Sequence, residues 1–201
     1  MAIAMKDLEI RGAGNLLGAD QSGHIAEVGF DLYLRLVGEA VAEFRGSQAE
    51  PEPEMKIELP VDAHLPVEYV ESERLRLEMY KRLAAVAGEA DIAAVREELQ
   101  DRYGPLPEPA ETLLGVAGFR IAAREHGVSE VVMAGRMVRF SPADLPDSAQ
   151  LRLARLYPGS QYRKASAQVL VPRPMTAAIG GQPVADSALL AWVGKVLTDI
   201  F

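Results

Sequence analysis

The sequence is divided by an eight-residue run of proline and acidic residues, Ser-Gln-Ala-Glu-Pro-Glu-Pro-Glu, at positions 47–54. Proline fixes φ and neighbouring like charges repel one another, so a run of this composition stays extended and solvated. It predicts a linker at 47–54 between a short N-terminal unit, residues 1–46, and a larger domain, residues 55–201. The N-terminal unit is too small to bury a core of its own and therefore needs a partner surface.

The N-terminal unit contains a glycine-rich run, residues 11–24, that shows little helix or strand periodicity. Glycine reaches positive φ and lets another chain approach closely, so this run predicts a shaped loop. An amphipathic helix follows the loop and ends at Gly46. Its apolar positions recur at helical spacing: Tyr33, Leu36, Val37, Ala40, Val41 and Phe44.

The glycines of this loop permit two further interpretations. Gly12-Ala13-Gly14 opens like a dinucleotide-binding fingerprint, but Gly18 comes one place too late and no buried strand precedes the run. Composition alone favours an ordinary glycine-rich connector. An isolated nucleotide- or DNA-binding enzyme domain built on the Gly12–Gly18 loop stays open as the alternative function, which ATPase and cofactor-binding assays would test.

Composition restricts the classes of protein to which the chain can belong. The 201 residues include no cysteine and three scattered histidines, His24, His64 and His126, so a disulfide is impossible and a metal site is not expected. No run reaches the ~18 apolar residues of a membrane span. No signal peptide is visible, so a cytoplasmic protein without membrane partners is expected. The net charge of −8 is unlike that of a free-standing DNA-binding protein, which is normally basic.

Residues 55–201 show helical and strand-like patterns separated by glycine and proline. Short strands are expected at 57–61, where Pro60 indicates a sheet edge, at 128–133 paired with 136–140, and at 162–164 and 168–171. Helices are expected at 72–88, at 91–103 with Asp91 as N-cap, from Pro107 or Pro109 to 126, and at 147–156 and 187–201. This order predicts an α+β fold, in which a compact domain of several helices with a small antiparallel sheet follows the N-terminal helix and loop.

The N-terminal unit resembles the TRG translocation motif, which RecG and the bacterial transcription-repair coupling factors (Mfd) share. The resemblance is carried by Asp-Leu-Glu-Ile-Arg-Gly-Ala-Gly-Asn-Leu-Leu-Gly at 7–18, Gln-Ser-Gly-His at 21–24 and Gly-Phe-Asp-Leu-Tyr at 29–33. It implies that Arg11 and Gln21 couple ATP hydrolysis to stepping on double-stranded DNA, in a loop shaped by Gly12, Gly14 and Gly18. A charged guanidinium fork and an amide that both donates and accepts suit such contacts.

The larger domain resembles a second part of the same family. Residues 75–82, Leu-Arg-Leu-Glu-Met-Tyr-Lys-Arg, and 98–107, Glu-Leu-Gln-Asp-Arg-Tyr-Gly-Pro-Leu-Pro, are similar to the C-terminal domain of these factors, which RecG lacks. The resemblance implies a C-terminal fragment of an ATP-dependent DNA translocase that releases RNA polymerase stalled at lesions and recruits UvrA. ATP and Mg²⁺ would then bind motor domains outside this chain, which contains no G-x-x-x-x-G-K loop. The fragment itself is expected to hold no catalytic residue, cofactor or metal.

Charge is distributed unevenly along the larger domain, with a net −7 over residues 51–127 and +3 over residues 128–201. At about 100° per residue, Glu97, Glu98 and Asp101 fall opposite the apolar stripe of their helix, so three carboxylates share one exposed face. The resemblance implies that this domain docks on the protein's own N-terminal UvrB-like module and masks its UvrA-binding surface, with Glu98 and Asp101 in the interface. The alternative is that these carboxylates only solubilise the helix.

Overall fold

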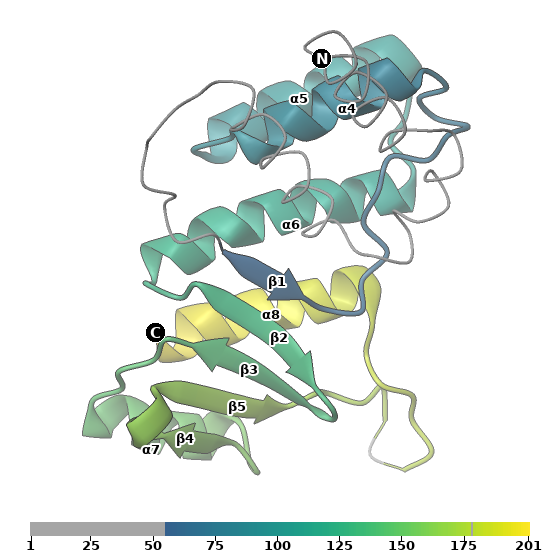
Figure 1. Ribbon diagram of the computed structural model, residues 1–201. Helices are drawn as coiled ribbons and strands as arrows, with labels where there is room; N and C mark the ends of the chain where they lie inside the picture. The colour runs from purple at the N-terminus through teal and green to yellow at the C-terminus, as the bar shows by residue number, and fades with distance from the viewer. Residues whose placement is uncertain (1–54, 178) are drawn as a thin grey trace, which may run out of the picture.

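The computed structural model describes residues 55–177 and 179–201, in which five α-helices and five β-strands are found (Figure 1). The predictions for the N-terminal unit, including Arg11, Gln21 and the glycine loop, lie outside the described residues. The same holds for the linker predicted at 47–54.

Three layers make up the described part of the chain (Figure 1). The helices are α4 (Glu73–Ala84), α5 (Glu89–Tyr103), α6 (Glu108–Glu125), α7 (Asp147–Leu156) and α8 (Asp186–Ile200). The strands are β1 (Lys56–Glu58), β2 (Glu130–Ala134), β3 (Met137–Ser141), β4 (Gln161–Arg163) and β5 (Gln168–Pro172), with a 3₁₀ turn, η2 (Lys164–Ser166), between β4 and β5. Helices α4 and α5 lie side by side in an outer layer, α6 lies beneath them, and the sheet with α7 and α8 forms the rest.

The fold class predicted from the sequence, α+β, is confirmed, but the sheet is mixed. Its strand order is β1-β2-β3-β5-β4, and four of the strands pair antiparallel as expected. Strand β1 instead pairs parallel with β2, with Ile57 opposite Val131. It lies at the sheet edge, as predicted, and it ends at Glu58, two residues before Pro60, which has no N–H to donate to the ladder. The three helices between β1 and β2 provide the long crossover that a parallel pair requires.

One face of the sheet carries the core. Strand register aligns five side chains across it: Ile57, Val131, Phe140, Val169 and Tyr162. All but Tyr162 are buried, and the Phe140 ring centroid lies 5.8 Å from that of Phe201, just after α8. Helix α8 covers this face, as Figure 1 shows, and buries the stripe predicted for it: Leu189, Val193, Val196, Leu197 and Ile200.

Helix α6 packs against α8 on one side and against α4 and α5 on the other. A Cβ atom on Gly115 would lie 2.8 Å from Leu190 Cδ2 of α8, a distance that real Cβ contacts do not reach. Gly118 lies at ordinary contact distance from Ile92 of α5, since its Cβ would be 3.5 Å from Ile92 Cδ1. The Leu190 side chain therefore packs directly over Gly115 where α6 meets α8.

Two helix boundaries differ from the sequence prediction. Helix α4 ends at Ala84 rather than at 88, so Ala87, predicted to face the core, is exposed in the connection to α5. Asp91 is the third residue of α5 and not its N-cap. Its carboxylate accepts hydrogen bonds from the backbone N–H of Ala87 at 2.9 Å and of Gly88 at 3.2 Å. Asp91 thus satisfies backbone N–H donors that precede α5 from a position inside the helix. Sequence periodicity does not distinguish this arrangement from an N-cap.

Glu130 lies on the outer face of the sheet beside two residues of β3. Its carboxylate pairs with the Arg139 guanidinium and accepts a hydrogen bond of 3.0 Å from the Ser141 hydroxyl. Burial raises the pKa of Glu130, but the hydrogen bonds from Arg139 and Ser141 and the charges of Arg139 and Lys56 outweigh it. The pKa of Glu130 therefore lies below its ordinary value of 4.5.

This depressed pKa predicts an acid-sensitive contribution to stability. A carboxyl group with a lower pKa in the folded state stabilises the fold above its unfolded pKa and loses this contribution as pH falls through the folded pKa. We expect the free energy of unfolding to decline below pH 4.5 and Glu130→Gln to flatten part of that decline. Urea denaturation at neutral and acidic pH measures the free energy of unfolding, and Glu125→Gln, at an exposed position, is the control. Equal pH slopes for Glu130→Gln and wild type would contradict the assignment.

We also expect residues 55–201 to fold without the N-terminal unit. Their buried apolar residues form one continuous cluster that draws on all three layers, so the domain has its own core. Expressed alone, 55–201 should melt cooperatively by circular dichroism, whereas residues 1–46 should show no cooperative transition. A 55–201 segment without a cooperative melt would refute the predicted domain boundary.

Candidate interdomain interface

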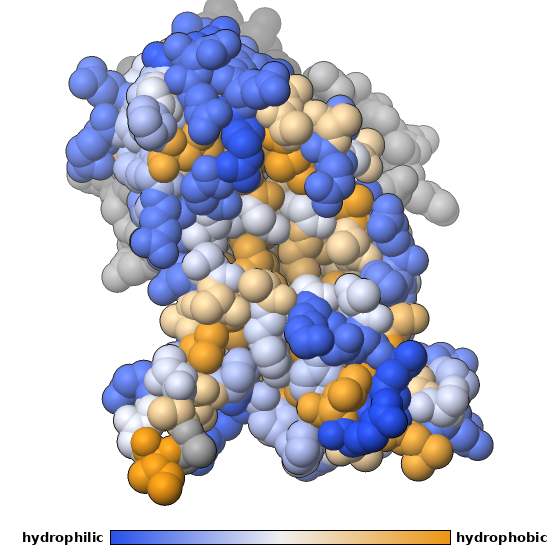
Figure 2. Space-filling model, turned by 180° about the vertical axis from the view of Figure 1, so that it is seen from behind, coloured by the Kyte–Doolittle hydropathy of each residue, from blue (hydrophilic) through white to orange (hydrophobic). Residues whose placement is uncertain are grey.

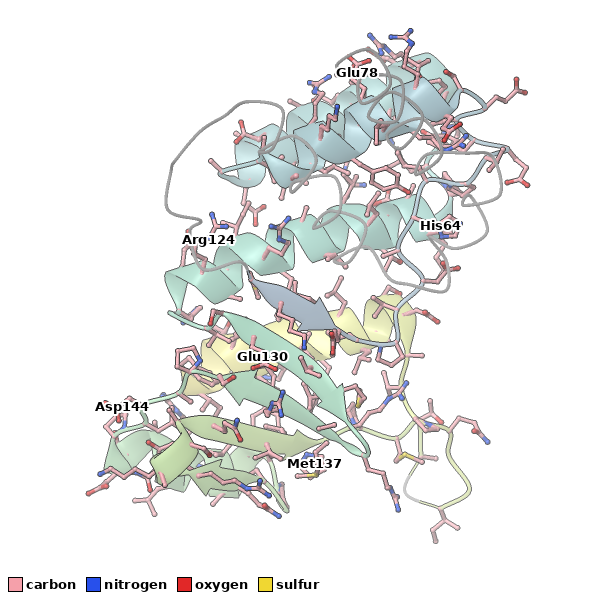
Figure 3. All side chains as sticks on the ribbon, viewed as in Figure 1. His64, Glu78, Arg124, Glu130, Met137 and Asp144 are labelled. Atoms are coloured by element: carbon pink, nitrogen blue, oxygen red, sulfur yellow. The ribbon has the colours of Figure 1, made fainter. Side chains whose placement is uncertain are left out.

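Helix α5 presents one apolar side to the protein and one polar side to solvent. Val95 and Leu99 are buried, and Ile92 and Tyr103 are partly buried, as the sequence stripe predicted. Glu97 and Asp101 lie on the opposite side and are exposed. Figure 3 labels Glu78 of the neighbouring α4, another exposed carboxylate of the same outer layer.

The C-terminal end of α5 is held by aromatic residues. The Tyr69 hydroxyl lies 3.0 Å from the Leu99 carbonyl oxygen and 2.9 Å from that of Gly104, and it donates to these acceptors. The Tyr69 and Tyr103 rings meet edge to face with centroids 5.7 Å apart. Burial raises the pKa of Tyr69, and the charges of Glu111 and Tyr103 add to that rise, so this hydroxyl stays a donor. The exposed carboxylates therefore stand on a helix whose end is fixed.

Glu98 differs from the exposed face that the sequence predicted. Its side chain is 21% exposed and pairs with Arg82 of α4 and, at 3.2 Å, with Arg102 one turn further along α5. The α4–α5 contact brings Arg82 to it, so Glu98 is a structural link between two helices. Glu98 is therefore less available than helical spacing predicted, because two guanidinium groups already pair with its carboxylate. Its place in an interdomain interface stays a prediction.

Two of the three predicted interface residues keep their carboxylates available. Within residues 55–177 and 179–201, neither Glu97 nor Asp101 forms an ion pair. Arg82 and Arg102 add cationic groups beside them. Sequence reasoning missed both arginines: the i, i+4 spacing of Glu98 and Arg102 was a usable signal, whereas only the fold brings Arg82 to Glu98.

This arrangement suits recognition of cationic side chains. The described residues contain no group of three or more His, Asp or Glu side chains placed to hold a metal ion. None of the described helices combines the length and apolarity needed to cross a bilayer. Exposed carboxylates on a fixed helix form charge-assisted hydrogen bonds with arginine or lysine of a partner surface. The predicted coupling residues Arg11, Gln21, Gly12, Gly14 and Gly18 lie outside the described residues, so their placement relative to this face is not described.

Comparison with known proteins connects this geometry with one family. Residues 59–151, which include α4, α5 and α6, match the TRCF domain family. The chain is 50% identical over 212 residues to the transcription-repair-coupling factors of Mycobacterium bovis and Mycobacterium tuberculosis, with 100% of the chain and 17% of each relative covered. It is 44% identical over 141 residues to the Staphylococcus haemolyticus factor, covering 69% of the chain and 12% of that relative. The chain therefore spans less than a fifth of these relatives.

The fold has a solved counterpart. The crystal structure of the C-terminal domain of a transcription-repair coupling factor aligns with a TM-score of 0.57 and covers 73% of this chain and 93% of that one. Sequence identity over the alignment is 17%, so this likeness concerns the fold alone.

The two kinds of carboxylate on α5 are expected to respond differently to neutralisation. Glu98→Gln removes two ion pairs, one with Arg82 of α4 and one with Arg102 of α5 itself, and should lower the free energy of unfolding by about 1 kcal/mol. Glu97→Gln, which breaks no pair within the described residues, should change it by less than about 0.5 kcal/mol. Urea denaturation of both variants at neutral pH measures this difference. Equal destabilisation would mean that the Glu98 pairs contribute nothing in solution.

Proposed function

Since the chain carries the TRCF domain of the transcription-repair-coupling factors, we propose that it is the C-terminal part of such a factor. The observation that carries this proposal is the alignment, at 50% identity, of the entire chain with 17% of a much longer relative. The full-length protein would be a cytoplasmic ATP-dependent translocase on double-stranded DNA that releases stalled RNA polymerase and recruits UvrA. The chain itself would hydrolyse no ATP, because ATP and Mg²⁺ would bind in motor domains outside it.

Residues 55–201 are, in this proposal, a regulatory domain. They dock on the protein's own N-terminal UvrB-like module and mask the surface to which UvrA binds. The exposed Glu97 and Asp101 pair with basic residues of that module, while Glu98 holds α4 against α5 through Arg82. The proposed contact is therefore made by Glu97 and Asp101, whereas Glu98 keeps a structural role.

Residues 1–46 would couple the motor to movement along DNA. Arg11 and Gln21 would contact the motor domain from a loop whose glycines permit close approach. Their function is mechanical, so loss of either side chain should spare ATP binding while it abolishes stepping.

The free energies of such charge pairs are of the size that a reversible docking contact needs. Truncating one partner of a desolvated interfacial pair costs roughly 2–5 kcal/mol, whereas an exposed pair contributes ~0–1 kcal/mol. A closed state favoured by a few kcal/mol is converted to a largely open one when two such pairs are replaced by repulsion.

In the full-length protein, Glu97→Arg with Asp101→Arg should increase UvrA capture and raise basal ATPase activity and DNA binding. A matched control is Glu125→Arg with Asp144→Arg, which makes the same charge change at exposed sites away from α5 (Asp144 is labelled in Figure 3). Glu98 is left intact because its replacement would also disturb α4. Pulldown with purified UvrA is the measurement. Capture equal to wild type, with the variant domain folded, would leave these carboxylates as solubilising residues.

Arg11→Ala and Gln21→Ala should each impair the activity of the same full-length protein. Release of stalled polymerase should be lost while nucleotide binding remains. If these variants release polymerase at the wild-type rate, the motor-coupling proposal fails independently of the interface proposal.

A further inference from the structure

The C-terminal turn of α5 is bound by a residue that belongs to neither α4 nor α5. Tyr69 lies in the connection between β1 and α4. Its hydroxyl donates to the Leu99 carbonyl oxygen at 3.0 Å and to the Gly104 carbonyl oxygen at 2.9 Å. Asp101 lies between these two acceptors in the chain and is exposed. One hydroxyl therefore brackets the turn from which the Asp101 carboxylate projects.

Gly104 ends α5 in a way that leaves one carbonyl group to be satisfied from outside the helix. It has φ +82°, a conformation that favours glycine, and its N–H donates to the Gln100 carbonyl oxygen at 2.9 Å. Its own carbonyl oxygen lies past the last turn and has no partner in the helical ladder. Tyr69 supplies that partner. Because helix ends fray, this hydrogen bond favours the formed state of the last turn.

Tyr69 is itself fixed, because α4 holds the chain on both sides of it. Before Tyr69, the Leu65 N–H donates to the Tyr80 hydroxyl oxygen at 2.8 Å. After Tyr69, the Arg76 guanidinium donates to the Val70 carbonyl oxygen at 2.6 Å. Tyr80 and Arg76 both belong to α4 and both are buried. The hydroxyl that binds the end of α5 therefore stands on a backbone that α4 keeps in place.

The position of Asp101 matters because the surface around it is polar. Figure 2 shows the outer helical layer, at the top of the view, as largely hydrophilic. A partner that docks there depends on charge-assisted hydrogen bonds, which weaken steeply when donor and acceptor are misaligned. A carboxylate on a turn that stays formed keeps its alignment. A frayed turn has to be ordered when the partner binds, which lowers affinity.

We propose that Tyr69 is a positioning residue for the docking contact, whose hydroxyl holds the last turn of α5 in the conformation that presents Asp101 to basic residues of the partner module. This inference rests on the proposed function, because it specifies how the α5 face achieves its affinity. Glu97 lies before the first acceptor, so the hydroxyl does not bracket it. The contribution of Glu97 to docking is therefore independent of Tyr69.

Hydrogen–deuterium exchange of the 201-residue chain tests the local effect of the hydroxyl. Tyr69→Phe keeps the ring and removes only the donor, so amide groups in the last turn of α5 should exchange about threefold to tenfold faster, as expected for loss of one hydrogen bond. Tyr157→Phe is the matched control. The Tyr157 hydroxyl donates to Asp199 at 2.7 Å and its ring meets Trp192 edge to face, away from α5. Unchanged exchange in Tyr69→Phe would overturn the proposal.

A double-mutant cycle in the full-length protein tests the functional step. UvrA capture by pulldown reports how much of the protein is undocked. Asp101→Asn and Tyr69→Phe should each increase capture, and Tyr69→Phe should add little in the Asp101→Asn background, because both act on one contact. In the Glu97→Gln background, Tyr69→Phe should keep its full effect. A residue that only stabilised the fold would act equally in both backgrounds.

The outcomes distinguish this inference from the proposed function. If Asp101→Asn and Glu97→Gln leave capture at the wild-type level, the α5 face is not the docking surface and both proposals fail. If Asp101→Asn raises capture while Tyr69→Phe does not, the docking surface stands and the positioning role of Tyr69 is overturned. Equal effects of Tyr69→Phe in both backgrounds, matched by Tyr157→Phe, would also overturn it, because the hydroxyl would then contribute to overall stability alone.

Discussion

Helix α6 is buried on two opposite sides, and the relative position of the outer helices and the sheet depends on it. One stripe contains Ala110, Leu113, Leu114 and Ala117, and the other contains Thr112, Val116, Phe119 and Ala123. At about 100° per residue these stripes point in opposite directions. A helix between two layers needs apolar side chains on both sides and small residues where a neighbour comes closest, which Gly115 provides at Leu190. The layer that carries α5 is thereby fixed to the layer that carries α8.

The sequence predicted the local elements better than their arrangement. Helix α7 lies at the residues predicted, and α8 and the β2–β3 hairpin lie within two residues of their predicted bounds, because amphipathic periodicity and turn glycines are local signals. For α6 the pattern indicated a single stripe. The second buried side was missed although Val116 and Phe119 are apolar, because a helix covered on two sides departs from the single stripe of an amphipathic surface helix. The parallel pairing of β1 was missed because nothing in three strand residues specifies a partner that lies beyond three helices.

The predicted interface residues show the same limit of sequence-based prediction. Helical spacing placed Glu97 and Asp101 on the outer side of α5, and both are exposed there. The same spacing placed Glu98 with them, yet its carboxylate lies between Arg82 and Arg102. Sequence spacing gives the direction of a side chain relative to its own helix, whereas the charge that compensates it depends on the neighbouring helix. Acidic residues on a helix face are therefore available to a partner only where basic residues of the same domain do not already pair with them.

The α5 face proposed as an interface lies at one end of the described part of the chain and the sheet at the other, with α6 between them (Figure 1). The α5 face belongs to the outer layer, which Tyr69 and the Arg96–Glu111 pair hold in place. Glu97 and Asp101 are exposed on the outer side of α5 and take no part in the buried stripes that pack α6 between the layers. Because sites without shared partners respond additively to substitution, charge reversal on α5 changes the outer face without changing the core beneath it.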